Sequence, residues 1–193
     1  MKIGLPPRIL LAAVLLTAAL VGVVVRESLA RARGAEVVLP INAYDPRSPL
    51  SGHFVRFAIT YPIPKGAACP PGADAAVPDW RWVILRRDGA FHRVASVGGT
   101  RQGDRPGDVP VWGWVTCHPA GDGDPRAQGA LTLDLRVDRF HADQRQAEAI
   151  ERSLRLDPGQ SPSAFAVLSI DDRGKARLKG IIVNGRRTDL TWL

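Results

Sequence analysis

Ser51 and His53 carry the groups that nucleophilic hydrolysis uses, a hydroxyl and an imidazole, two residues apart. On an extended segment the two side chains would point to the same side. No third group close to them in the sequence orients the imidazole, and the serine precedes the strand that begins here. We therefore interpret Gly52, between them, as a conformational residue that lets the chain turn into the strand.

The other histidines, at positions 92, 118 and 141, are isolated in the sequence. A zinc site would need clustered ligands at spacings such as HxH or HExxH. The acidic loops at 104–108 and 122–124 have no glutamate at the spacing of a calcium-binding loop, so solvated turns are the favoured interpretation. We expect no metal and no cofactor.

Two further groups of residues have both a functional and a structural interpretation. Glu148 and Glu151 share one face of a predicted helix with several arginines, which favours an ion-paired solvent face over a catalytic pair. Trp80 and Trp82, and likewise 112 and 114, place two indoles on one strand face. Exposed, they would form a platform for a glycan or an apolar partner, but we expect them to fill the core because exposed tryptophan is costly.

Positive charge is concentrated near the beginning of the chain. The formal net charge is +7, but from Gly34 onward 21 basic residues stand against 18 acidic ones, with no basic run longer than two residues. Nucleic-acid binding requires clustered lysine and arginine. The sequence therefore predicts no nucleic-acid partner.

Residues 9–25 form a run of 17 uncharged, mostly apolar residues. As a helix it would be about 25 Å long, a minimal membrane span. The alternative is a signal peptide cleaved after Ala30 or Ala32, but the run exceeds the usual length of its apolar region. We divide the chain into a membrane anchor with a basic connector, residues 1–33, and an exported domain, residues 34–193. Flanking basic residues do not decide the orientation.

Cys69 and Cys117 are the two cysteines of the chain, and both lie in the exported part within turn-rich segments. An even pair in an exported domain predicts a disulfide. The alternative is two free thiols in a cytoplasmic domain.

After residue 34, strand-like runs alternate with Gly, Pro and Asp breaks, which predicts a mainly β fold: an antiparallel sheet, sandwich or barrel-like domain. Asp88-Gly89 and Asn184-Gly185 predict hairpins. Pro40, Pro62 and Pro64 are expected to end strands. The runs predicted as strands are 36–39, 52–61, 80–85, 91–97, 111–116, 131–137, 164–170, 176–183 and 186–190.

One packed helix is predicted after these first strands. Asp143 can cap it, and Ala147, Ile150 and Leu154 form one apolar stripe that would lie against the sheet. Asp157-Pro158-Gly159 ends it.

The apolar run at 38–40, the approach DPRSPLSG at 45–52 and the strand HFVRF after it resemble, in this order, the bacterial GDYXXLXY family. Gly52 matches the motif strictly. His53 replaces the motif acid, Phe54 and Phe57 stand for its tyrosine and leucine, and Ile59 replaces the final tyrosine. The resemblance continues through the Asp88-Gly89 hairpin, Arg139-Phe140, the predicted helix to Glu151 and the closing strands.

This resemblance implies a single-pass, membrane-anchored envelope protein of unassigned biochemical role, in a family often found beside multi-pass membrane proteins. It also implies a shared structural or contact site, for which the candidates are Gly52, His53, Phe54, Val55, Phe57, Arg139, Phe140 and Glu151.

We therefore predict a non-catalytic accessory or interaction module for another envelope membrane protein. It would sit in the bacterial inner membrane with its C-terminal domain in the periplasm. The alternatives are an envelope hydrolase or glycan-binding protein, in which distant residues converge, and a soluble periplasmic ligand-binder released by signal peptidase.

Overall fold

The computed structural model describes residues 7–43, 54–73, 79–119, 129–141 and 164–190. Within these ranges the chain forms one helix and ten strands, and every strand pairing is antiparallel. The predicted mainly β fold is confirmed. The helix predicted from Asp143 to Asp157 lies outside the described residues.

The ten strands are numbered in the order in which they occur along the chain. Their bounds are β1 (Ala35–Ala43), β2 (Phe54–Ile63), β3 (Arg81–Asp88), β4 (Phe91–Gly98), β5 (Val109–His118), β6 (Gly129–Asp134), β7 (Arg139–His141), β8 (Ala164–Ile170), β9 (Ala176–Val183) and β10 (Arg186–Asp189). In space the order is β10-β9-β8-β1-β2-β6-β5-β3-β4, and β7 pairs with the beginning of β2.

The sheet curls so that its last strand, β4, lies against β1. The described residues of these two strands are not paired by backbone hydrogen bonds. Instead, the Val38 amide on β1 donates a hydrogen bond of 3.2 Å to Nδ1 of His92 on β4. The Tyr61 hydroxyl on β2 donates a further bond of 3.1 Å to the His92 carbonyl. The strands from β1 round to β4 thus form a barrel-like unit closed by a side chain, and β8, β9 and β10 extend the sheet from β1.

The core fills the inside of this curled sheet. Residues at alternate positions point inward, as in β5, where Val111, Val115 and Cys117 are buried. The expectation that the tryptophans fill the core is wrong. The four at positions 80, 82, 112 and 114 are half-buried or exposed. On β3 and β5 the indoles of Trp82, Trp112 and Trp114 occupy outward positions next to inward-facing, buried valines.

The prolines expected to end strands do not all do so. Pro40 lies inside β1, at the point where the strand changes partner from β8 to β2, and Pro62 lies inside β2. Proline has no N–H to donate to a neighbouring strand. At Pro62 this costs no hydrogen bond to β1, because the pairing of β2 with β1 reaches only to Ile59. The predicted end of the sixth strand at Val137 is also wrong, because Arg136 adopts a positive φ of 58° just after Asp134.

Both predicted hairpins are confirmed. Gly89 and Ala90 join β3 to β4, and only Gly89 has a positive φ, of 62°, the pattern of a type II′ turn. Asn184 and Gly185 join β9 to β10 with φ values of 50° and 76°, as a type I′ turn requires.

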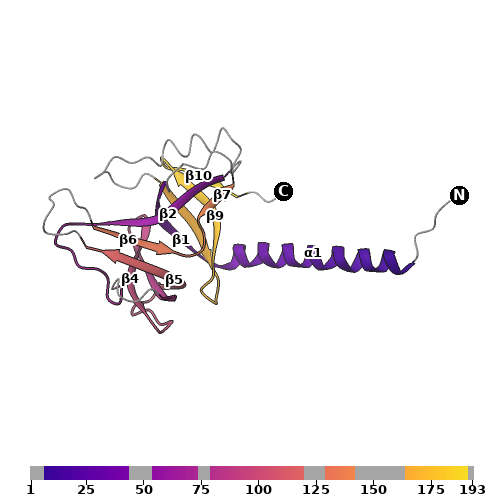
Figure 1. Ribbon diagram of the computed structural model, residues 1–193, viewed down its shortest axis with the longest axis horizontal. Helices are drawn as coiled ribbons and strands as arrows, with labels where there is room; N and C mark the ends of the chain where they lie inside the picture. Colours follow the sequence, from indigo (N-terminus) through magenta and orange to yellow (C-terminus); the bar gives the residue numbers. More distant parts are fainter. Residues whose placement is uncertain (1–6, 44–53, 74–78, 120–128, 142–163, 191–193) are drawn as a thin grey trace.

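The apolar N-terminal run is a helix, α1 (Pro7–Arg33), which projects from one end of the β domain (Figure 1). It includes the segment expected to be a basic connector, so that only Gly34 separates helix from strand. The stretch from Ile9 to Arg33 contains an 18-residue window with a mean hydropathy of 2.6, and no part of that window is buried against the protein. The helix is thus long and apolar enough to cross a membrane.

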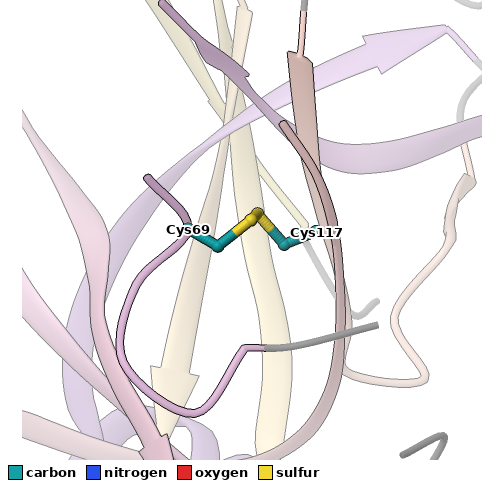
Figure 2. Close-up of a disulfide and its surroundings, with 2 residues drawn as sticks. All are labelled: Cys69 and Cys117. Atoms are coloured by element: carbon teal, nitrogen blue, oxygen red, sulfur yellow. A yellow bond between two sulfur atoms is a disulfide. The ribbon is translucent and has the colours of Figure 1, made fainter. Parts of the chain in front are cut away.

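The predicted disulfide is present. Cys69, in the loop after β2, is bonded to Cys117 near the end of β5, and the two are 48 residues apart (Figure 2). Cys117 is buried in the core and Cys69 packs against it, so the bond ties an irregular loop to the barrel-like unit. The apolar helix and this disulfide together suggest export to an oxidising compartment.

Candidate functional site

The motif strand, β2, pairs along its first residues with the short strand β7. Val55 lies opposite Phe140 and Arg56 opposite Arg139, and the Phe57 amide donates a 3.0 Å hydrogen bond to the Asp138 carbonyl. Two segments about eighty residues apart, both singled out from the sequence, are therefore adjacent in the fold.

This strand pair divides its side chains between core and surface. Phe57 and Phe140 are buried in the core. Arg56 and Arg139 have side chains 44% and 57% exposed, and each guanidinium lies 3.6 Å from the Asp138 carboxylate. Gly52, His53 and Glu151 lie outside the described residues, and Phe54 and Val55 are placed only by their backbone.

A second set of polar residues connects the helix to the β domain. Arg177 on β9, with a side chain only 10% exposed, donates from Nε to Glu27 on α1 at 2.5 Å and from Nη1 to Asp171 at 2.7 Å. One guanidinium therefore holds the end of the helix and the β8–β9 turn together.

The β8–β9 turn is itself well organised. Oδ1 of Asp171 accepts the amides of Arg173 and Lys175, each at 2.9 Å. Burial alone would raise the pKa of Asp171, but the hydrogen bonds from Arg177 and from these two amides outweigh it and lower that pKa. The turn also bonds to β5, because the Gly174 carbonyl accepts the Trp112 amide at 2.9 Å.

Between this turn and the helix lies an open groove of about 1170 Å³. Its helix wall is apolar, with Ala18, Val21, Gly22, Val25 and Leu29. Its other lining residues are mostly charged: Arg26, Arg33, Asp171, Asp172, Arg173, Lys175 and Arg177. The groove is therefore apolar along the helix and cationic where the helix meets the β domain.

The outward-facing tryptophans lie beside the same turn. Trp82 and Trp112 are cross-strand partners with ring centroids 5.3 Å apart, edge to face. Arg101 lies over the Trp82 ring, and Trp112 is 43% exposed. A part of this aromatic surface is thus accessible to solvent.

The chain matches the family model described as GDYXXLXY protein over residues 16–181. It belongs to the GDYXXLXY family. The resemblance seen in the sequence is thereby confirmed. No curated protein and no solved structure shows a significant match to the chain.

For this GDYXXLXY protein, sequence reasoning missed the residues that connect α1 to the β domain. Glu27, Asp171 and Arg177 are far apart in sequence and match no motif, so only the sheet order brings them together. Asp108, which we expected in a solvated turn, is instead buried and bound by both Nε and Nη2 of Arg86, at 2.9 and 2.8 Å. This ion pair lowers the pKa of Asp108.

No group of three or more potential metal ligands occurs within the described ranges. His92 is buried between β4 and β1, and His118 lies exposed at the end of β5. His141 lies in β7, opposite Phe54. The three histidines therefore occupy separate strands.

Proposed function

We propose that this protein is a single-pass inner-membrane protein of the bacterial envelope, whose β domain lies on the periplasmic side. There it acts as a non-catalytic interaction module for another envelope membrane protein. The helix α1 is the anchor.

The rigid junction between helix and β domain carries this proposal. Only Gly34 separates α1 from β1, and Arg177 binds Glu27 near the end of the helix. A side chain at position 34 would approach the Ile170 carbonyl to 2.7 Å, so the junction is tightly packed. Such a junction keeps the domain at one orientation to the bilayer, which suits contact with a neighbouring membrane protein.

The same junction supports an uncleaved anchor. Cleavage after Ala30 or Ala32 would remove Glu27 and with it the ion pair to Arg177. A disposable signal peptide has no need of such a contact with the mature domain.

The proposed contact surface is the edge formed by β2 and β7. Its candidates remain the residues named from the sequence. Among those whose side chains the structure describes, Arg139 is exposed, and its cross-strand neighbour Arg56 is exposed beside it. These exposed guanidinium groups would recognise carboxylates or carbonyls of a partner.

Photo-crosslinking in intact membranes tests this proposal. A photoreactive residue at Arg139 should give a reproducible crosslinked species that contains a second membrane protein, whereas the same residue at Lys65, an exposed site in the loop after β2, should not. If both positions give the same products, or neither gives one, the proposed contact surface is wrong.

Glycan binding is a second candidate, favoured by Trp112, whose ring is 43% exposed next to Trp82. Aromatic faces of this kind stack on sugar rings. Retention on peptidoglycan that is lost in Trp112→Ala and kept in Arg139→Gln would support this function over the first.

A further inference from the structure

We propose that the groove between α1 and the β8–β9 turn binds the headgroup of an anionic phospholipid. This inference rests on the membrane anchoring proposed above and adds a lipid to the partners of the protein. Its basis is the division of the groove into an apolar wall and a cationic end.

The groove has an apolar part and a charged end, which match the acyl chain and the headgroup of a phospholipid. Along α1 it is lined by apolar side chains, and Ala18 and Gly22 leave space beside the helix, since a Cβ at Gly22 would have no atom within 4 Å. An acyl chain fits this part. Where the apolar stretch ends, at Arg26, the lining becomes charged, at the depth where headgroups lie.

The charged end has an excess of cations. Five basic side chains, from Arg26, Arg33, Arg173, Lys175 and Arg177, face only two acidic ones in the lining. Arg177 is committed to Glu27 and Asp171, which lie on the two sides of the groove. Among the described residues, the side chains of Arg26, Arg33, Arg173 and Lys175 form no ion pair, so four cations can serve a phosphate.

Two of these cations, Arg173 and Lys175, lie on a turn whose backbone is fixed by hydrogen bonds. Asp171 binds the backbone amides of Arg173 and Lys175, and Gly174 is bonded to Trp112 and packed on the Trp82 ring. The turn is therefore held by its backbone, and the side chains of its two basic residues, Arg173 and Lys175, are exposed. A fixed backbone reduces the ordering cost of binding.

The location of these charges on the exported side also needs a reason. Basic residues next to a membrane span normally mark the cytoplasmic side, and cations on the other side oppose that preference. Attraction to anionic headgroups of the outer leaflet of the same membrane would offset this cost.

The test measures lipid preference in the full-length protein in phosphatidylcholine nanodiscs. Spin-labelled phosphatidylglycerol and phosphatidylcholine report the fraction of each lipid held by the protein. Wild type should prefer phosphatidylglycerol, and Arg173→Gln/Lys175→Gln should lose this preference about 30-fold, since each of the two cations near an anionic surface contributes on the order of 1 kcal/mol. Arg26→Gln, on the opposite wall, should lower the same preference and tests the groove independently if the double variant does not fold.

A matched control removes the same charge elsewhere. Lys65→Gln/Arg186→Gln changes two exposed cations that lie outside the groove and should keep the preference of wild type. Equal effects of the two double variants, or equal binding of both lipids by wild type, would overturn the inference. Displacement of the bound lipid by millimolar inorganic phosphate would identify a site for soluble anions instead and would also overturn it.

The failure of this inference is distinguishable from that of the proposed function. A protein that enters nanodiscs but shows no lipid preference leaves the anchor intact and removes only the lipid site. A protein that stays soluble and does not enter the bilayer removes both.

Discussion

At the scale of single residues, His92 is the side chain on which closure of the curled sheet depends. Its Nδ1 must be unprotonated to accept the Val38 amide, and its carbonyl accepts the buried Tyr61 hydroxyl. Burial lowers the pKa of His92, and the nearby positive charge of Arg87 lowers it further. The neutral imidazole is therefore the form that the fold requires.

We predict that the free energy of unfolding falls as the pH drops below about 6.5, where the histidine of the unfolded chain gains its proton. Because the folded pKa is lower, the unfolded state binds more protons in this window, so stability rises with pH and is lost on acidification. Urea unfolding at pH 7.5 and 5.5 measures the difference.

The matched variants are His92→Asn and His92→Leu. Asparagine offers an acceptor near the position of Nδ1 and does not titrate, so the pH dependence between 7.5 and 5.5 should be smaller than in wild type. Leucine leaves the Val38 amide unsatisfied and should cost about 1 to 3 kcal/mol at pH 7.5. An unchanged pH dependence in His92→Asn would contradict the role of this imidazole.

Gly174 gives a second prediction at this scale. Its φ is +77°, and a Cβ there would overlap the Trp82 ring, whereas Gly185 has nearly the same φ, +76°, with open space around it. Gly185→Ala should therefore cost only the backbone strain, about 1 to 2 kcal/mol. Gly174→Ala should cost about 1 to 3 kcal/mol more, from the added overlap. Thermal unfolding of the two variants checks the order, and equal losses would show that the turn does not press on Trp82.

At the scale of elements, local patterns predicted most of the strands. Ala164–Ile170 and Ala176–Val183 were placed to the residue, since the strand-like apolar runs and the turns at Asp171 and Asn184 that bound them are local signals. The interior prolines could not be placed correctly, because whether Pro40 ends a strand depends on which neighbour pairs at that point. The ion pairs of Arg177 depend on the whole sheet order and leave no local signal.

The loop after β2 depends on the disulfide for its attachment to the sheet. Cys69 and Cys117 close a segment of 48 residues, and a crosslink of this span should contribute about 4 kcal/mol by restricting the unfolded chain. We predict that full reduction lowers the free energy of unfolding of wild type, measured by urea unfolding, by an amount near this value.

The double variant Cys69→Ala/Cys117→Ala is the control for this prediction. It should unfold at the midpoint of the reduced protein and should not respond to reductant. A wild-type midpoint that does not change on full reduction would show that the bond contributes no stability.

At the scale of the whole molecule, α1 joins the β domain at the C-terminal end of the helix, where Glu27 binds Arg177, and the helix then projects away from the strands (Figure 1). The remainder of the helix exposes large apolar side chains, among them Leu11, Leu16 and Val24, each more than 60% exposed. Such a surface is stable only when covered by lipid or by another protein. The two ends of the molecule are thus built for different surroundings, with the Arg177 ion pairs at the boundary.

We predict that the mature protein in the membrane keeps its full mass of 20.8 kDa and exposes Leu193 on the periplasmic side. Cleavage after Ala30 or Ala32 would instead remove about 3 kDa, as the signal-peptide alternative requires. Mass spectrometry of the carbonate-extracted membrane fraction gives the mass, and a reporter fused after Leu193 gives the side. Faster migration on a non-reducing gel, abolished in Cys69→Ala, would show the oxidised pair in the same sample. A reporter active only in the cytoplasm, with both thiols reduced, would contradict the periplasmic location, because a structural disulfide does not persist in that compartment.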